Sequence, residues 1–111
     1  MNKYIVCITD DAYNDLACIT KYIIEKYNDY FSAKQISDKL FDKCYSLSIF
    51  PVRSSKQYRI NDRTIHSVHT GKYTILYYID SGSHTVHILA ITNSRRDITS
   101  LLNKRIANST S

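Results

Sequence analysis

The hydrophobic period of the sequence changes at Pro51, the single proline among its 111 residues. Before Pro51, apolar side chains recur every three or four positions, which is the spacing of one helix face; after it they alternate or run together, as in strands. Proline also pushes the preceding residue out of the helical region, so a helix must end near Ile49. The change of period predicts an α+β fold in which two long helices precede most of the strands.

Two amphipathic helices are predicted before Pro51. The first covers residues 10–27, with Thr9 as its cap and acidic residues in its first turn. The second covers residues 32–49, where Ser32 and Gln35 form a capping box. Their apolar stripes consist of Ala12, Leu16, Ile19 and Ile23 in the first helix, and of Ala33, Ile36, Leu40, Cys44 and Leu47 in the second. Because only a short turn separates them, the helices are expected to form an antiparallel hairpin.

The remaining segments predict a four-stranded, largely antiparallel sheet. Its strands are expected at residues 3–8, 63–69, 73–79 and 84–92, and residues 52–58 form a loop or an edge strand. The last strand is apolar on both faces, as in a central strand covered from both sides. A short C-terminal helix follows, which gives the order β-α-α-β-β-β-α. A single domain is expected over residues 3–104, followed by a flexible tail at 105–111.

Two adjacent arginines, Arg95 and Arg96, stand where the C-terminal helix is expected to begin. Ser94 and Asp97 match a capping box at this point. Positive charge in the first turn of a helix is unfavourable, so the arginines break a local rule, and such residues are candidates for function. The alternative is a purely structural role, in which they form salt bridges to acids of the first helix such as Asp11 or Asp15.

The basic residues are concentrated in the second half of the chain. Residues 9–49 carry five lysines against seven acids, a net charge of −2, whereas residues 50–111 carry nine basic residues against three acids, a net charge of +6. This asymmetry favours one surface that meets phosphate or carboxylate groups. No apolar run approaches the ~20 residues that span a membrane, so no membrane partner is expected.

The three cysteines, Cys7, Cys18 and Cys44, match no metal-binding spacing and cannot all pair with one another. We expect three reduced, mostly buried thiols in a cytoplasmic protein. No metal site and no cofactor is predicted.

A series of short motifs resembles the RelE/ParE toxins of type II toxin–antitoxin modules over about residues 3–102. The motifs are Tyr4-Ile-Val-Cys-Ile-Thr9 followed by Ala12, Asp15-Leu16 and Tyr22-Ile23; Leu47-x-x-Phe50-Pro51; Arg63 before a strand; Tyr73-x-Ile75-x-Tyr77-x-Ile79-Asp80; and Val86-x-Ile88 leading into Arg95-Arg96-Asp97. The resemblance implies the small α+β fold that the periodicity predicts, and it implies a growth-inhibiting toxin.

The family contains two mechanisms. RelE-like members are ribosome-dependent mRNA endonucleases, in which basic residues stabilise the phosphate and a His or Tyr near the C-terminus usually joins the acid–base work. The stretch from Ile98 to Ser111 contains no His and no Tyr. If the chain were such a nuclease, its site would be drawn from Lys56, Arg63, His66, His69 and Arg96. His66 and His69 are three residues apart, so on one regular strand they point to opposite faces.

ParE-like members inhibit DNA gyrase and lack the nuclease residues. Because the C-terminal stretch of this chain contains no His and no Tyr, the sequence favours a gyrase inhibitor without enzymatic activity. The mRNA endoribonuclease is the alternative. A non-toxic nucleic-acid-binding module is the second alternative, although no recognised nucleic-acid-binding motif is present.

The resemblance also implies a cognate antitoxin. Family antitoxins wrap the toxin with a segment that carries apolar and acidic residues, and the basic second half supplies the electrostatic complement. The expected contacts to the antitoxin or the target are Arg63, Tyr73, Arg95 and Arg96, and a toxin–antitoxin hetero-oligomer is possible. The target would be gyrase or the ribosome and its mRNA. Tyr73, Tyr77 and Tyr78 are otherwise expected to pack as strand residues against the helices.

Overall fold

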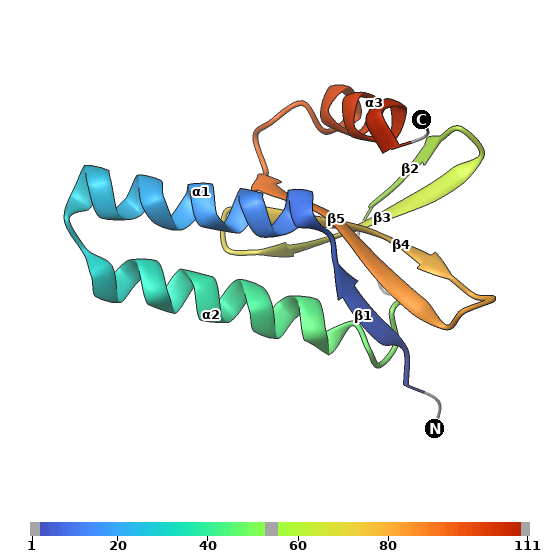
Figure 1. The fold of residues 1–111 in the computed structure, drawn as a ribbon, viewed down its shortest axis with the longest axis horizontal. Coiled ribbons are helices and arrows are strands. Elements are labelled where there is room, and N and C mark those ends of the chain that lie inside the picture. Colours follow the sequence, from blue (N-terminus) through green and yellow to red (C-terminus); the bar gives the residue numbers. More distant parts are fainter. Residues whose placement is uncertain (1–2, 53–55, 110–111) are drawn as a thin grey trace.

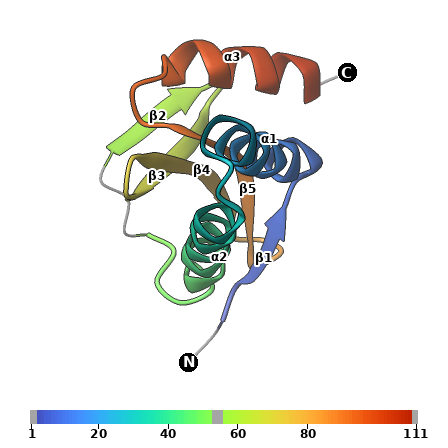
Figure 2. The ribbon, with the colours of Figure 1, turned by 90° about the vertical axis from the view of Figure 1, so that its left-hand side faces the viewer.

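A computed structural model describes residues 3–52 and 56–109, with side chains up to residue 106. Within this part of the chain, three layers are stacked, with a helical hairpin on one face of a sheet and a single helix on the other (Figures 1 and 2). The elements in chain order are β1 (Ile5–Ile8), α1 (Asp10–Tyr27), α2 (Tyr30–Ser46), β2 (Lys56–Ile60), β3 (Arg63–Thr70), β4 (Tyr73–Asp80), β5 (Thr85–Asn93) and α3 (Ile98–Ser109). The predicted α+β architecture is confirmed.

The described residues form a five-stranded sheet in the order β1-β5-β4-β3-β2, one strand more than predicted. The additional strand is β2, from the segment expected as a loop or an edge strand, and it pairs antiparallel with β3 at the sheet edge. β1 pairs parallel with β5, whereas the other pairings are antiparallel. β5 therefore lies inside the sheet, as its apolar sequence predicted.

Local capping groups determine where the two long helices begin. α1 has the predicted bounds, and the Ala12 amide donates to the Thr9 hydroxyl at 3.3 Å. α2 begins two residues before the predicted position, because Asp29 rather than Ser32 is the cap. The Asp29 carboxylate accepts from both the amide and the hydroxyl of Ser32, at 3.0 and 2.6 Å. A carboxylate is a stronger acceptor than a hydroxyl, so the earlier residue caps the helix.

The C-terminal end of α2 also differs from the prediction, since the helix ends at Ser46 and not at 49. The amides of Leu47, Ser48 and Ile49 donate to carbonyl groups three residues earlier, which closes the helix with tighter turns. Phe50 has a φ of 54°, so the chain has left the helix before Pro51.

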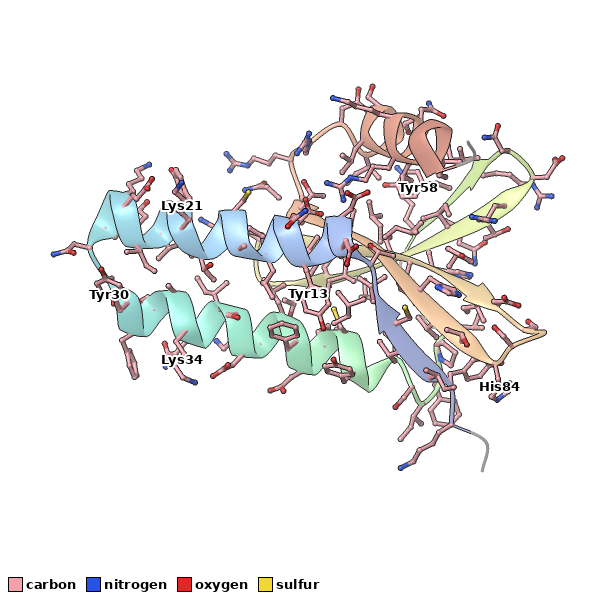
Figure 3. The ribbon with its side chains drawn as sticks, viewed as in Figure 1. Tyr13, Lys21, Tyr30, Lys34, Tyr58 and His84 are labelled. Atoms are coloured by element: carbon pink, nitrogen blue, oxygen red, sulfur yellow. The ribbon has the colours of Figure 1, made fainter. Side chains whose placement is uncertain are left out.

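The helical hairpin packs its predicted stripes on one face of the sheet. Leu40 and Cys44 are fully buried there beside Tyr77, whose hydroxyl donates to the Pro51 carbonyl at 2.6 Å. Burial raises the pKa of the Cys44 thiol to about 12. Lys21 and Lys34 point outward from opposite sides of the hairpin (Figure 3).

α3 covers the opposite sheet face. Ile98, Leu101, Leu102 and Ile106 pack on Ile60, Ile65, Leu76 and Ala90. A bulge in β5 supports this packing, because Leu76 pairs with Ala90 whereas Tyr77 pairs with Ile88, which leaves Leu89 as the extra residue. Leu89 and Ala90 can therefore both contribute to the α3 side.

The boundary expected after Lys104 falls inside α3. The helix continues to Ser109, Ile106 is buried, and the Arg105 side chain bonds to α1. Residues 105–109 therefore continue the folded helix instead of beginning a tail. No helix in the described ranges is long and apolar enough to cross a membrane.

Candidate functional site: two polar sites at opposite ends of the sheet

The first polar site lies at the sheet end that carries the β3–β4 turn and the loop from β5 to α3. Gly71, with a φ of 58°, makes the turn, and the Ser94 amide donates to the Lys72 carbonyl at 2.9 Å, which joins turn and loop. A cavity of about 360 Å³ lies between them, lined by Gly71, Lys72, Asn93, Ser94 and Arg95. We call this place the turn-end site.

A small hydrogen-bonded network forms one side of the turn-end site. The Thr74 hydroxyl lies 2.9 Å from Nδ1 of His69 and 2.7 Å from the Ser94 hydroxyl. Ser94 therefore bonds to the sheet and does not cap α3. The cap is Asp97, whose carboxylate accepts from the amide and the hydroxyl of Ser100 at 3.1 and 2.9 Å. These bonds hold the pKa of Asp97 below its ordinary value.

Arg95 and Arg96 are exposed on this loop. Their backbone amides donate to Asn93, at 2.9 Å to the side-chain oxygen and 3.0 Å to the carbonyl. Among the described residues, neither guanidinium has a hydrogen-bond or ion-pair partner, and the alternative salt bridges to Asp11 or Asp15 are not formed. The two cations are therefore available to an anionic partner.

Asp15, which the structural alternative paired with Arg95 or Arg96, is bound by Arg105 instead. Arg105 donates to both carboxylate oxygens of Asp15, each at 2.6 Å, and to the Leu89 carbonyl at 3.0 Å. Sequence reasoning missed Arg105 because it lay in the expected tail. Continuing the apolar spacing of Leu101 and Leu102 by one helical turn would have placed Arg105 and Ile106 beside the sheet.

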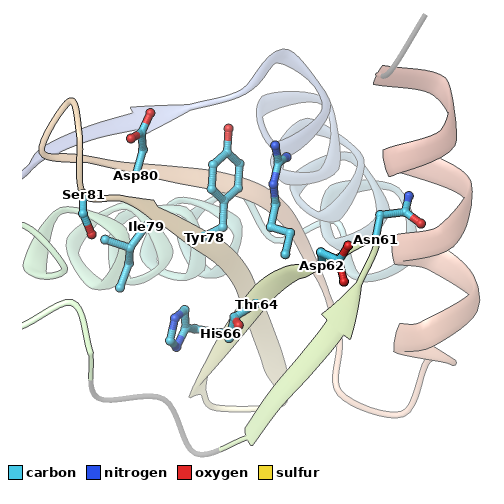
Figure 4. A pocket seen from close by; sticks show the side chains of 9 residues that line it. Asn61, Asp62, Thr64, His66, Tyr78, Ile79, Asp80 and Ser81 are labelled. Atoms are coloured by element: carbon cyan, nitrogen blue, oxygen red, sulfur yellow. The ribbon is translucent and has the colours of Figure 1, made fainter.

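The second polar site lies where the sheet divides. The pairing of β3 with β4 ends at His66 and Tyr77. Beyond this point β3 pairs with β2 alone and β4 with β5 alone, so the two strand pairs diverge (Figure 1). A cavity of about 620 Å³ opens in the fork, and we call it the fork cavity (Figure 4). Its lining is Asn61, Asp62, Arg63, Thr64, His66, Tyr78, Ile79, Asp80 and Ser81.

Stacked side chains hold Arg63 at the fork cavity. Its guanidinium lies 4.3 Å from the centre of the Tyr78 ring, and Tyr78 stacks on His87 at 4.6 Å. Lys56 is similarly placed over Tyr58 at 5.1 Å, and Tyr58 lies beneath α3 (Figure 3). Cations stacked on aromatic rings remain charged and keep their N–H groups available.

The two histidines of β3 lie on opposite faces of the sheet, as their spacing predicted. His66 is buried and stacks on Tyr77 on the side of the helical hairpin. Burial lowers the pKa of His66, so the neutral imidazole is favoured at pH 7. His69 is exposed and belongs to the turn-end site on the α3 side.

The structure brings Arg63 and His66 together at the fork cavity, but it does not bring all the predicted site residues into one site. Arg63 and Thr70 are the two ends of β3, which at ~3.3 Å per residue are roughly 23 Å apart. Arg63 thus belongs to the fork cavity, whereas Arg95 and Arg96 belong to the turn end. Tyr73, another expected contact, is 8% exposed and packs in the core.

The described residues contain no group of three His, Cys, Asp or Glu side chains that could hold a metal ion. Cys7 and Cys18 are exposed and only Cys44 is buried, so the expectation of mostly buried thiols is wrong.

A family model described as the ParE toxin of the type II toxin–antitoxin system parDE matches residues 6–98. This match spans most of the chain, from β1 to the start of α3. The chain belongs to the ParE toxin family. It is therefore a toxin of a type II toxin–antitoxin system.

Solved structures of toxins share the fold of this ParE-family toxin. The toxin–antitoxin complex RelBE2 of Mycobacterium tuberculosis contains a chain with 26% identity and a TM-score of 0.62, covering 82% of this toxin and 98% of that chain. The chromosomal ParDE system of Pseudomonas aeruginosa contains a chain with 10% identity and a TM-score of 0.68, covering 84% and 98%. A free Escherichia coli RelE mutant has 9% identity and a TM-score of 0.61, covering 96% and 97%. The search of curated proteins gives no match.

Proposed function

We propose that this toxin inhibits growth by binding and blocking a protein target, DNA gyrase, and that a cognate antitoxin neutralises it. The observation that carries the proposal is the distribution of its cations. They lie at opposite ends of the sheet, and the sheet face between them is filled by α3 with apolar side chains, among them Ile65, Leu76 and Leu102. This arrangement offers separate contact points to a large partner.

Metal-free cleavage of RNA needs a general base, a general acid and charge stabilisation within reach of one phosphate. Arg63, Arg95 and Arg96 remain protonated at neutral pH and cannot act as bases. His66 lines the fork cavity together with Arg63, but it is only 8% exposed and burial favours its neutral form. The second imidazole, His69, lies at the turn end, so the acid–base groups of the predicted nuclease set are not gathered at one site.

One observation favours mRNA cleavage as a second candidate function. The turn-end site brings His69 close to the loop of Arg95, with the Ser94 hydroxyl 3.5 Å from Nδ1 of His69. An imidazole close to the loop that carries an unpaired guanidinium offers one acid–base group and one cation, two of the three groups that cleavage needs. If the toxin cleaves mRNA, His69 and Arg95 are the residues expected to act.

The two functions are distinguished by assaying both targets with the same protein. Purified gyrase is tested for plasmid supercoiling with increasing toxin, and mRNA from expressing cells is mapped by primer extension. We expect inhibited supercoiling and no toxin-dependent cuts. Ribosome-dependent cuts that vanish in His69→Ala, with supercoiling unimpaired, would replace the gyrase proposal by the endonuclease.

The antitoxin proposal is supported by the structural relatives from Mycobacterium tuberculosis and Pseudomonas aeruginosa, which come from the RelBE2 complex and the ParDE system. An antitoxin that touches Arg63 as well as Arg95 and Arg96 must span the length of the sheet. An extended segment that orders on binding meets this requirement better than a compact domain. Both gyrase and the ribosome are cytoplasmic, and we assign the toxin to the same compartment.

A further inference from the structure

The fork cavity exposes backbone groups as well as side chains. Asn61 and Asp62, with φ of 51° and 63°, form the two-residue turn that joins β2 to β3, and Ile60 pairs with Arg63 to close it. The residues that close such a turn are joined by a backbone hydrogen bond, so the backbone of Arg63 faces β2. Because successive residues of a strand direct their backbone groups to alternate sides, the N–H and C=O of Thr64 face away from β2 and into the fork.

The backbone of β4 borders the other side of the fork. The Lys72 carbonyl, directly before β4, accepts from the Ser94 amide, directly after β5. Even-numbered residues of β4 therefore direct their backbone groups to β5, and odd-numbered ones direct them to β3. Ile79 lies beyond the last residue of β4 that pairs with β3, so its N–H and C=O also face into the fork. Thr64 and Ile79 both line the cavity (Figure 4).

Within the described ranges, Thr64 and Ile79 have no strand partner on the side of the fork. Thr64 is paired with β2 and Ile79 with β5, and the β3–β4 pairing ends before both. Each residue offers one N–H and one C=O, and unpaired groups of this kind are a template for another strand. An extended polypeptide presents N–H and C=O groups to both sides and can satisfy the two edges at once. A nucleic acid backbone presents phosphate acceptors but no N–H donors for the two carbonyls.

The side chains of the fork cavity carry charges of both signs. Among the described side chains, Arg63 has no acid within ion-pair distance. Asp62 and Asp80 line the same cavity. Hydrogen bonds from Ser83, through its side chain and its amide, and from the Gly82 amide hold the pKa of Asp80 below its ordinary value, so this carboxylate is charged at neutral pH. A ligand that matches the cavity therefore offers both a carboxylate and a cation.

The two ends of the sheet thus suit different partners. The described lining of the turn-end cavity contains Lys72 and Arg95 and no acid, which favours a purely acidic partner. At the fork, Asp62 and Asp80 repel such a partner and attract a segment that carries both signs of charge. The fork cavity is therefore better suited to the target than to an acidic antitoxin.

We propose that the fork cavity receives an extended, mixed-charge segment of DNA gyrase, which inserts as a strand between β3 and β4. Its backbone pairs with Thr64 and Ile79, and one of its carboxylates pairs with Arg63. Because β3 and β4 are antiparallel, the inserted strand runs parallel to one of them and antiparallel to the other. The inference rests on the proposed function and adds the place where the toxin binds its target.

Hydrogen exchange of the full-length toxin, alone and bound to purified gyrase, tests the insertion. The amides of Thr64 and Ile79 should exchange about tenfold more slowly in the complex, because each acquires a hydrogen bond. The amide of Ile8 is the reference. The next amide, of Thr9, donates to a carbonyl of β5, so the backbone of Ile8 faces the outer edge of the sheet. Exchange at Ile8 should not change.

Charge reversal tests the contact to Arg63 with a separate readout. Arg63→Glu should raise the toxin concentration that half-inhibits plasmid supercoiling about tenfold. Lys104→Glu, at an exposed lysine of α3, is the control with the same change of charge and should alter this concentration less than about twofold. Arg63→Lys keeps the charge and should lie between wild type and Arg63→Glu. A thermal melt of each variant checks that it is folded.

Inhibition by the wild-type toxin without protection of Thr64 and Ile79, or full inhibition by Arg63→Glu, would overturn the insertion and leave gyrase as the target. Protection of the two amides by plasmid DNA alone would assign the cavity to nucleic acid. Protection only by the protein of the neighbouring reading frame would assign it to the antitoxin. Either result also overturns the proposal. A wild-type toxin that neither binds nor inhibits gyrase would overturn the insertion and the proposed function together.

Discussion

Arg105 and Asp15 are ninety residues apart in the sequence and form a two-bonded ion pair, with both N–O distances at 2.6 Å. One carboxylate oxygen of Asp15 also accepts from the Ile91 amide at 2.9 Å. The pair therefore joins α3, α1 and β5 at one point. Contact with Asp15 raises the pKa of Arg105 above its ordinary value. Removing this ion pair should therefore lower the stability of the whole domain.

Arg105→Ala should destabilise the toxin by about 3 kcal/mol, because it leaves the partly buried Asp15 carboxylate without its cation. The free energy of unfolding from urea titration measures this loss. Arg105→Lys keeps the charge but cannot form the fork of two bonds, so it should retain part of the stability. An unchanged unfolding midpoint in Arg105→Ala would show that the pair is not structural.

Leu40→Ala should cost ~2–5 kcal/mol, because Leu40 is fully buried between α2 and the sheet and its loss leaves a cavity. A thermal melt compared with that of wild type measures the effect. Lys43→Ala, on the same helix, removes a charged side chain rather than a core one and serves as the control. Equal melting temperatures for wild type and Leu40→Ala would contradict the assignment of Leu40 to the core.

Acidification should destabilise the toxin through His66. Burial lowers its pKa in the folded state below the ordinary 6.5, so the unfolded chain binds the proton more readily. Stability from this residue is therefore present above pH 6.5 and falls as the pH drops through the unfolded and then the folded pKa. Urea titrations between pH 7.5 and about pH 5 measure how the free energy of unfolding changes with pH. This change should be smaller in His66→Gln than in wild type. An identical change in both proteins would show that other groups cause the pH dependence.

The three thiols should react at two distinct rates. Cys7 and Cys18 are exposed, whereas Cys44 is buried with its pKa raised to about 12, so its thiolate is scarce at neutral pH. A disulfide reagent at pH 8 should modify two thiols rapidly in the native toxin and the third only after denaturant is added. Rapid modification of all three without denaturant would mean that α2 opens readily from the sheet.

Reversing the charge of Arg95 and Arg96 should weaken binding of the antitoxin and make the remaining affinity less sensitive to salt, because both guanidinium groups lack partners within the described part of the toxin and are available to an acidic partner. The equilibrium dissociation constant for the antitoxin is the measurement. The control is Arg59→Glu, an exposed arginine on the edge strand β2. If the Arg95/Arg96 variant kept wild-type affinity, the loop would lie outside the interface.

The elements that the sequence predicted well are those whose signals are local. α1 was located to the residue because Thr9, Asp10, Asp11 and the apolar stripe all lie within one segment. β2 could be predicted only as a loop or an edge strand, because Lys56–Ile60 is mostly polar and becomes a strand by pairing with β3. The start of α2 was misplaced because Asp29 and Ser32 could each cap the helix, and the choice between them depends on geometry.

The sites were harder to predict than the fold because they depend on register and on distant contacts. The sequence identified Arg63, Arg95 and His69 as candidates, but it could not show that β3 separates Arg63 from the turn end. Nor could it show that the sheet divides after Tyr77, since this depends on which strands pair. Arg105 was missed because it fell in the expected tail and because its partner lies ninety residues away.

The pairing of β1 with β5 has a consequence for synthesis of the toxin. Ile5 is aligned with Thr85 and Ile8 with Ile88, so the first strand finds its neighbour only when the last strand has been translated. Asp15 must likewise wait for Arg105. A nascent chain can form the α1–α2 hairpin early, but the three layers close only after β5 and Arg105 have been synthesised. Until then the hairpin lacks the sheet on which its apolar stripes pack, so the newly made toxin is not yet a complete fold.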